Sequence, residues 1–216
     1  MTLQNKIIPV TDLRQNCSVI WCDETMRGAI VDPGGDVEKI ISGVEEAGVT
    51  PELILITHGH MDHAGGAAAM AEHFNVPIEG PHIDDKFLVD ALPHQGAMYD
   101  VPGCRTYEPT RWLKGGDNIK FGNIVIDVLH CPGHTPGHVV FYERGRAMAF
   151  VGDVIFKGSI GRTDFIMGNH EDLIHSIRET LFPLGDGVTF VPGHGSTSTF
   201  GEERKTNPYV GDSVVG

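Results

Sequence analysis

The sequence predicts a single mixed α/β (α+β) domain, because short β-branched apolar segments are interspersed with amphipathic segments along one ordinary globular chain. The chain has 216 residues, of which 40% are hydrophobic and 21% charged. That composition is typical of a globular protein with a sizeable core. No repeat, low-complexity tract or Pro/Ser-rich linker divides the chain. We therefore expect residues 1–216 to form one domain.

Seven apolar segments bounded by Gly and Pro predict strands. They cover residues 18–22, 29–31, 53–57, 124–129, 139–142, 147–151 and 188–191. Three amphipathic segments with helical spacing predict helices that pack by one face, at residues 36–47, 64–74 and 171–181. The proline-rich stretch 77–111 is the least regular part of the chain. We expect it to be a long surface excursion near the mouth of a pocket.

Charge and targeting signals limit the possible partners. The formal net charge of -13 disfavours sequence-independent nucleic-acid binding, which needs a basic face. The first residues lack the features of a signal peptide, and no apolar run approaches the roughly 20 residues of a membrane span. We therefore expect a cytoplasmic protein without a nucleic-acid or membrane partner, as a monomer or small homo-oligomer. Reduced thiols are expected at Cys17, Cys22, Cys104 and Cys131.

Three imidazoles and a carboxylate lie within the seven residues that follow the apolar segment 53–56. They are His58, His60, Asp62 and His63. Imidazole nitrogen and carboxylate oxygen suit zinc and neighbouring divalent metals, at distances of about 2.0–2.2 Å. Alternate residues converge on one ion if the turn between them is tight, which leaves the other two for a second ion. The spacing therefore predicts a metal site at the end of this strand.

Three later residues strengthen this prediction. His134 lies in CPGHTPGH just after the segment 124–129, and Asp153 follows the segment 147–151. His194 lies in VPGHG after the last predicted strand. Each is a potential ligand at the carboxyl end of an apolar run beside Gly or Pro, where loops present functional groups from a rigid scaffold. Together with the HxHxDH segment at residues 58–63, they make four such positions in one chain, which indicates a shared site rather than core packing.

This set of residues resembles the metallo-β-lactamase superfamily, whose usual early turn is matched by the DPGG sequence at residues 32–35. The resemblance covers essentially the whole chain and implies a four-layer αββα sandwich with the site along one edge. It implies a first metal held by His58, His60 and His134. It implies a second metal held by Asp62, His63 and His194, with Asp153 bridging the two.

Within the superfamily, the chain resembles the glyoxalase II branch, and most closely its small single-domain bacterial type. The matching stretches are residues 15–17, 129–141, 152–158 and 207–208. The resemblance implies hydrolysis of S-lactoylglutathione or related hydroxyacylglutathiones to glutathione and a 2-hydroxy acid. The expected cofactors are two divalent ions, zinc first, with iron or manganese as alternatives, because His and carboxylate ligands accept all three. The expected partner is therefore a small-molecule glutathione thioester.

Substrate contacts and a catalytic role follow from the same resemblance. Two-domain glyoxalase II enzymes carry a helical region with basic residues that hold glutathione, and the short segment after His194 leaves the contacts to other residues. Arg162 is the first candidate for a glutathione carboxylate contact and Lys157 the second. Asp62, as an acceptor for a hydrogen bond from a metal-bound hydroxide, is the expected catalytic residue.

Several other functions remain open on the sequence. The GRTDF segment at residues 161–165 also resembles mononuclear iron persulfide dioxygenases, in which His58, His134 and Asp153 would hold the iron. A lactonase of the same fold is a further alternative. A β-lactamase is less favoured, since such enzymes are exported and often carry Cys in place of Asp153. A metal-binding module without catalysis is disfavoured because all seven ligands are present.

Overall fold

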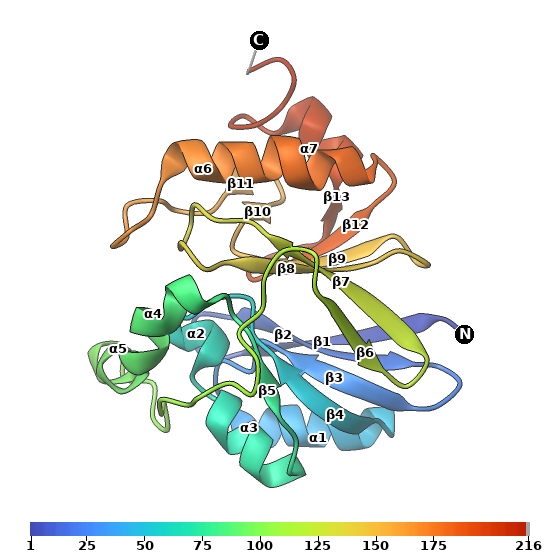
Figure 1. The fold of residues 1–216 in the computed structure, drawn as a ribbon, viewed down its shortest axis with the longest axis vertical. Coiled ribbons are helices and arrows are strands. Elements are labelled where there is room, and N and C mark those ends of the chain that lie inside the picture. Colours follow the sequence, from blue (N-terminus) through green and yellow to red (C-terminus); the bar gives the residue numbers. More distant parts are fainter. Residues whose placement is uncertain (215–216) are drawn as a thin grey trace.

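The structure, a computed structural model, describes residues 1–214 and consists of two packed β-sheets with helices on both outer faces (Figure 1). The first sheet has five strands in chain order: β1 (Leu3–Val10), β2 (Gln15–Cys22), β3 (Arg27–Val31), β4 (Thr50–Leu55) and β5 (Ile78–Glu79). The second has the order β13-β12-β9-β8-β7-β6: β13 (Ser198–Thr199), β12 (Thr189–Pro192), β9 (Met148–Gly152), β8 (Val139–Glu143), β7 (Ile124–His130) and β6 (Asn118–Phe121). β10 (Ile155–Phe156) and β11 (Ser159–Ile160) form a separate hairpin.

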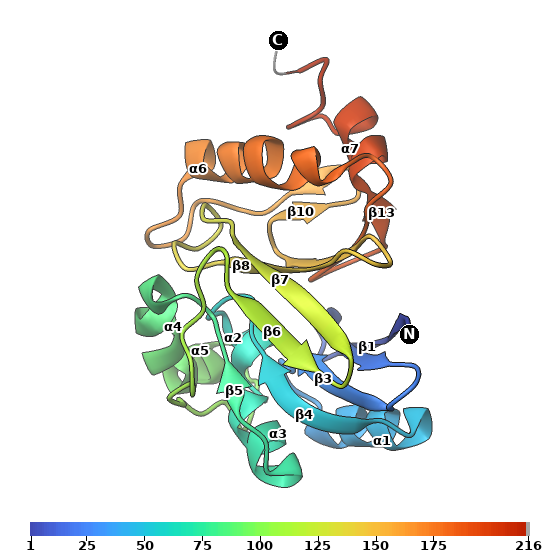
Figure 2. The same ribbon diagram turned by 45° about the vertical axis from the view of Figure 1, so that its right-hand side comes forward.

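The helices lie in two outer layers and one lateral group. They are α1 (Val37–Ala47), α2 (Met61–Ala64), α3 (Ala67–Phe74), α4 (Lys86–Asp90), α5 (Leu92–Met98), α6 (His170–His175) and α7 (Phe200–Thr206). A π-helical segment (Ser176–Leu181) continues α6, and short 3-10 helices cover Ile83–Asp85 and Phe182–Leu184. In the rotated view, α1 and α3 cover the first sheet and α6 and α7 the second (Figure 2). The predicted four-layer αββα sandwich is confirmed.

Three apolar clusters explain why the layers form. Successive strand residues point to opposite faces of a sheet. Val19 of β2 accordingly packs under α1 and α3, whereas Ile20 packs between the sheets. On β8, Phe141 points between the sheets and Val140 points toward α6. Both central strands are thus buried on both faces, which is why their sequences are continuous apolar runs.

The predicted elements correspond to β2, β3, β4, β7, β8, β9 and β12 and to α1, α3 and α6. The helix predicted over 64–74 is interrupted at Gly65, so that α2 and α3 are separate. The stretch 77–111 is more regular than predicted, because it contains α4 and α5. Pro93 lies in the first turn of α5, where a missing N–H costs nothing.

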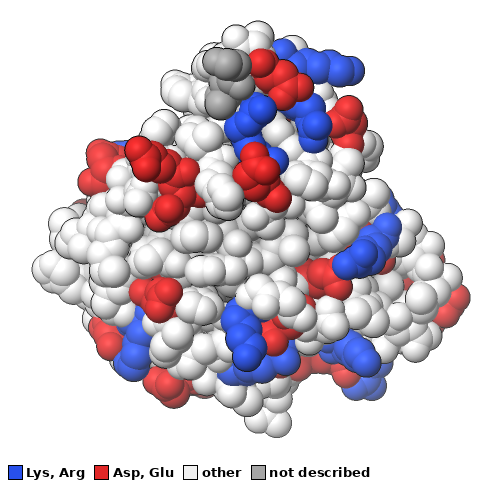
Figure 3. Space-filling view, turned by 45° about the horizontal axis from the view of Figure 1, so that its top comes forward, with Lys and Arg blue, Asp and Glu red and all other residues white. Residues whose placement is uncertain are grey.

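Charge is mixed on the face that Figure 3 draws, and the helices are short. On the face drawn in Figure 3, acidic and basic side chains are interspersed, without a continuous basic patch among the described residues. Within residues 1–214, none of the helices has the length and apolar character that a bilayer crossing requires. All four cysteines are free and buried, which fits the expected packing of small apolar side chains.

Candidate metal centre

The seven predicted ligand residues come together at one edge of the sandwich, on the loops that follow β4, β7, β9 and β12 and in the short helix α2. These are His58, His60, Asp62, His63, His134, Asp153 and His194. The parallel pairing of β9 with β12 brings the loop after each strand to the same edge. Ligands far apart in the sequence therefore meet because the strands that precede them end side by side.

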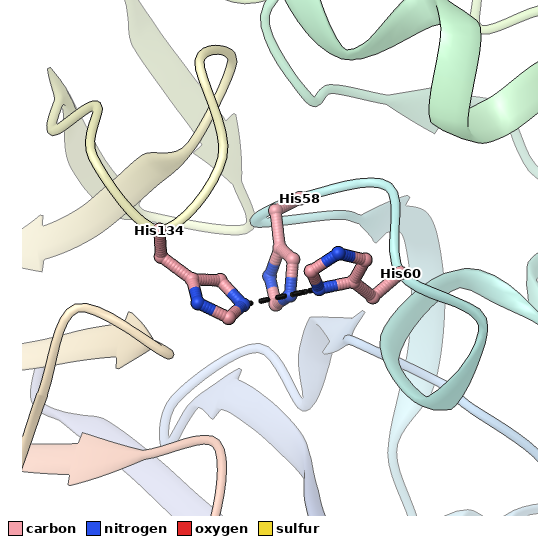
Figure 4. Close-up of side chains that lie close together, drawn as sticks. All are labelled: His58, His60 and His134. Atoms are coloured by element: carbon pink, nitrogen blue, oxygen red, sulfur yellow. Dashed lines mark hydrogen bonds between the residues drawn. The ribbon is translucent and has the colours of Figure 1, made fainter. Parts of the chain in front are cut away.

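His58, His60 and His134 form a group that we call the three-histidine group. The Nδ1 atom of His60 lies 3.1 Å from Nε2 of His58 and 3.0 Å from Nε2 of His134. Figure 4 shows the three rings turned toward one another. Nitrogen atoms bound to one tetrahedral zinc ion are about 3.3 Å apart, given bonds of about 2.0–2.1 Å. The spacing of this group is close to what a single ion requires.

Asp62, His63 and His194 form a second group, the mixed group. Nε2 of His194 lies 3.1 Å from Oδ2 of Asp62, and Nε2 of His63 lies 3.8 Å from the same oxygen. Asp153 lies between the two groups. Its Oδ1 is 3.3 Å from Nε2 of His63, and its Oδ2 is 3.7 Å from His134 and 3.8 Å from His194. This carboxylate is therefore within reach of both groups.

Asp32 connects the two groups from inside the protein. It is 2% exposed and accepts hydrogen bonds from the Thr57 amide (2.7 Å), the Thr57 hydroxyl (2.6 Å) and Nδ1 of His63 (2.8 Å). The Thr57 oxygen in turn lies 3.1 Å from Nδ1 of His58. Because these contacts engage Nδ1–H of each ring, the lone pair of a neutral His58 or His63 lies on Nε2, the atom that faces the cluster.

Backbone carbonyls orient two further rings in the same way. Nδ1 of His134 lies 2.8 Å from the carbonyl oxygen of Arg162, and Nδ1 of His194 lies 3.1 Å from that of Leu13. A carbonyl only accepts hydrogen bonds, so each Nδ1 must carry the proton. Four of the five imidazoles therefore have a fixed tautomer that directs Nε2 into the cluster.

The turn at residues 32–35 requires glycine at position 34. A Cβ atom on Gly34 would lie 1.5 Å from the carbonyl oxygen of Asp62. The turn can therefore approach the backbone of the ligand loop only without a side chain here. This explains why Asp32 can reach His63 across the loop.

The donor set fits a divalent metal ion. Nε2 of His63 and Oδ1 of Asp153 are buried without a hydrogen-bond partner, and such atoms are rare unless they serve a ligand. Burial and the neighbouring His134 lower the pKa of His60 to about 3, which keeps this ring neutral and able to ligate. Burial alone would lower the pKa of His63, yet Asp153, Asp62 and Asp32 raise it well above its usual value. The negative charge of these carboxylates therefore favours a bound cation.

The open side of the cluster is bordered by aromatic and basic side chains. Phe165 lies with its ring centroid 4.8 Å from that of His60 and at 5.5 Å from His134. The guanidinium of Arg162 stacks at 4.6 Å from the Phe165 ring centroid and pairs with Asp164. Both residues expected to contact substrate are exposed: Arg162 lies beside the three-histidine group, and Lys157 follows β10.

Sequence reasoning missed the buried residues that orient the ligands. His138 is completely buried, stacks on His58 at 4.6 Å between ring centroids, and accepts a hydrogen bond at Nε2 from the Asp153 amide (3.1 Å). In the sequence it is only the last residue of the CPGHTPGH segment, with no sign of this role. Asp32 was noted as part of a turn, without its contacts, and Thr57 was not singled out. Their chemistry lies in contacts that a linear motif does not contain.

A further group of potential ligands lies outside this cluster. It consists of His82, Asp84 and His130. Nδ1 of His82 already accepts a hydrogen bond from the Asp84 amide (3.3 Å), and Nε2 of His130 donates one to the carbonyl of Pro136 (2.9 Å). Because these nitrogen atoms have protein partners, we assign no ion to this group.

The αββα fold and the histidine–aspartate cluster at its edge define a metallohydrolase class of protein. Residues 10–197 match the model of the metallo-beta-lactamase superfamily. The chain belongs to this superfamily and is a metal-dependent hydrolase. The superfamily and the donor set together imply divalent metal ions.

Three known proteins illustrate the similarity. Hydroxyacylglutathione hydrolase GloC of Haemophilus influenzae is 46% identical over 95% of this chain and 97% of its own. A crystal structure of the BLEG-1 B3 metallo-beta-lactamase has a TM-score of 0.88 and 33% identity, covering 96% of this chain and 99% of that one. TTHA1623 in a di-iron-bound form has a TM-score of 0.85 and 32% identity, covering 94% and 99%.

Proposed function

We propose that this protein hydrolyses S-lactoylglutathione or a related hydroxyacylglutathione to glutathione and a 2-hydroxy acid. The convergence of the three-histidine group and the mixed group on the Asp153 carboxylate supports metal-assisted hydrolysis. The 46% identity to a hydroxyacylglutathione hydrolase over almost the whole length of both chains supports the substrate class.

The two ions have separate ligand sets in this proposal. The three-histidine group would hold the first and the mixed group the second, and Asp153 would contribute to both. Zinc is the first candidate, because nitrogen and carboxylate oxygen ligands in this number suit it. Iron is the main alternative, since a 32% identical relative has been crystallised in a di-iron form. Manganese accepts the same ligands.

The chain's own residues have defined tasks in the reaction. Two bound ions would supply a water molecule that is deprotonated near neutral pH. Asp62 is half-buried, and its Oδ2 faces His194 and His63, the other two members of the mixed group. In this proposal Asp62 accepts a hydrogen bond from the attacking oxygen and directs it to the thioester carbonyl. The leaving thiol has a pKa of about 8.5, so its thiolate departs without a strong general acid. Orientation of the nucleophile is therefore the main task left to the side chains.

Arg162 binds a glutathione carboxylate in this proposal. Its Nε and Nη2 atoms already donate to the two carboxylate oxygens of Asp164 at 2.9 and 2.7 Å. A planar guanidinium with five donors has further N–H groups for a second carboxylate. Stacking on Phe165 holds the guanidinium beside the cluster. Lys157, in the turn of the β10–β11 hairpin, is the second candidate for this contact.

Replacing Arg162 tests the substrate contact separately from the chemistry. Arg162→Ala is expected to raise KM for S-lactoylglutathione about tenfold with little change in kcat, the cost of about 1.4 kcal/mol of ground-state binding. Arg144→Ala is the matched control, because Arg144 is also exposed and paired with an aspartate, at the other end of β8. An equal rise of KM in both variants, or none in Arg162→Ala, contradicts the assignment.

The function itself is tested by metal analysis and turnover on the same preparation. The substrates are S-lactoylglutathione, a lactone, a β-lactam, and glutathione persulfide with oxygen uptake as the readout. We expect preferential thioester hydrolysis by protein that holds two divalent ions per chain. Oxygen consumption with the persulfide and no thioester hydrolysis would overturn the proposal in favour of a mononuclear iron dioxygenase. Preference for the lactone or the β-lactam would overturn the substrate class alone.

A further inference from the structure

A buried carboxylate outside the cluster connects two of its loops. Asp85 ends the 3-10 helix before α4 and is completely buried. Its Oδ2 accepts hydrogen bonds from the Gly59 amide (2.9 Å) and the Thr135 hydroxyl (2.8 Å). Its Oδ1 accepts one from the Gly137 amide (2.6 Å). Three donors from two loops thus converge on one side chain.

The donors lie next to the three-histidine group in the sequence. Gly59 separates His58 from His60, and Thr135 directly follows His134. The two loops come from different sheets, because one follows β4 and the other follows β7. Apart from the ligands themselves, Asp85 is therefore a direct polar link between the two halves of this group.

The packing around Asp85 is close on both sides. A Cβ atom on Gly137 would lie 2.5 Å from the Asp85 amide nitrogen and 2.7 Å from its Cβ. The loop after β7 can approach Asp85 only because this residue is glycine. The His82 amide also donates a hydrogen bond to the Gly137 carbonyl (3.0 Å). The segment before α4 and the loop after β7 are thus held in one register.

Helix α5 supports the other loop in a similar way. Oε1 of Gln95 accepts a hydrogen bond from the Met61 amide (3.1 Å), and its Nε2 donates to the Gly59 carbonyl (3.3 Å). The stretch that contains α4 and α5 therefore contacts the ligand loops through the buried Asp85 and the half-buried Gln95, in addition to covering the surface.

We propose that Asp85 is a positioning residue for the first metal ion, and that its carboxylate fixes the distance between the two loops that carry the three-histidine group. The inference rests on the proposed ligand sets but not on the proposed substrate. Asp85 does not touch the ion. It acts through two backbone amides and the Thr135 hydroxyl on the loops that carry the three rings, whereas His63 of the mixed group is held directly by Asp32.

The test is Asp85→Asn, which keeps the shape of the side chain but removes its charge and turns one acceptor into a donor. At least one of the three donors then faces an amide N–H. Burial raises the pKa of the Asp85 carboxyl to about 6, so measurements at pH 8 compare the ionised wild-type side chain with the amide. The control is Asp84→Asn, an exposed carboxyl in the same 3-10 turn.

Metal affinity is the readout, measured as zinc titration of the metal-free full chain against a chromophoric chelator. Histidine side-chain NMR signals during the titration report which group fills. We expect zinc affinity of the three-histidine group to fall at least about tenfold in Asp85→Asn, as for other outer partners of metal sites. The affinity of the mixed group stays within about twofold of wild type. Asp84→Asn changes neither.

Two further measurements separate positioning from a general loss of structure. The melting temperature of Asp85→Asn is compared with that of wild type in each metal state. We expect a smaller decrease for the metal-free proteins than for the metal-loaded ones. Thr135→Val removes one donor and is expected to give a smaller loss at the same group, even if Asp85→Asn fails to fold. Wild-type affinities in both variants, or an equal loss at both groups, would overturn the inference. A wild-type protein that binds no zinc at these residues would instead overturn the ligand assignment.

Discussion

Asparagine at position 32 should weaken binding of the second metal ion more strongly than binding of the first. Asp32 accepts three hydrogen bonds, two of them at Oδ2 from the Thr57 hydroxyl and His63 Nδ1. In Asp32→Asn one of the two oxygens becomes an NH2 group, so each orientation of the amide puts a donor against a donor. If NH2 replaces Oδ2, His63 avoids the clash only by taking the tautomer whose Nδ1 accepts. The proton then lies on Nε2, which faces the cluster.

The magnitude follows from the burial of these groups. His63 is completely buried and Asp32 is 2% exposed, so solvent cannot satisfy the displaced donor. An unsatisfied buried donor costs about 1–3 kcal/mol, and His63 must incur this cost to present a lone pair at Nε2. We therefore expect a loss of about 10–100-fold in zinc affinity at the mixed group, the range found when outer partners of metal ligands are removed.

The assay is the zinc titration of metal-free protein with histidine NMR as the reporter. In Asp32→Asn the His63 and His194 signals should respond only at higher zinc concentration, while the His60 and His134 signals should shift less, because Asp32 reaches their group only through Thr57 and His58. Asp85→Asn provides the reverse pattern in the same experiment. The reasoning about Asp32 is refuted if Asp32→Asn fills both groups with wild-type affinity, or if His63 keeps its proton on Nδ1 and still binds zinc weakly.

Two predictions concern stability. Removing the ions with a chelator should lower the free energy of unfolding by about 2.7 kcal/mol per ion at a free metal concentration 100 times the dissociation constant, and an unchanged melting temperature in calorimetry would contradict this. Glu203→Gln should cost about 1–3 kcal/mol in urea unfolding, because the buried Glu203 accepts hydrogen bonds from the Gly158 amide and Asn207 (both 2.8 Å). The exposed Glu202→Gln is its control, and equal stability of the two variants would count against the role of Glu203.

The layers of the fold were predictable because burial leaves a continuous signal in the sequence. Strands such as β8 and β9 are buried on both faces, so their residues form apolar runs that cannot be mistaken for loops. Strand β1 was missed, since four of its residues are only half-buried and its pattern is correspondingly mixed. Helices α4, α5 and α7 were missed because they are short, and short helices are stabilised by tertiary contacts more than by their own sequence.

The convergence of the seven candidate ligands could be predicted because their chemistry is unusual at their positions, directly after apolar runs and beside glycine or proline. Asp85 had no such signal. It is one of 29 acidic residues, and nothing in its local sequence distinguishes it from the exposed Asp84. Only the fold reveals that its carboxylate is buried against three donors. The sequence contained one indirect trace, the glycines at 59 and 137, which permit its close approach.

Asp32 and Asp85 together suggest how one cluster can hold two ions with separate controls. Each is a buried acceptor of three hydrogen bonds. Asp32 contacts His63 directly and His58 through Thr57, whereas Asp85 contacts the two loops of the three-histidine group. Asp32 fixes the proton of His63 from the side of the first sheet, whereas Asp85 fixes the distance between two loops from the side of α4. Among the described residues, neither forms a hydrogen bond with Arg162, the residue proposed to bind substrate. The Arg162 carbonyl, however, accepts a hydrogen bond from His134, so only changes confined to the Arg162 side chain are expected to leave the metal ligands in place.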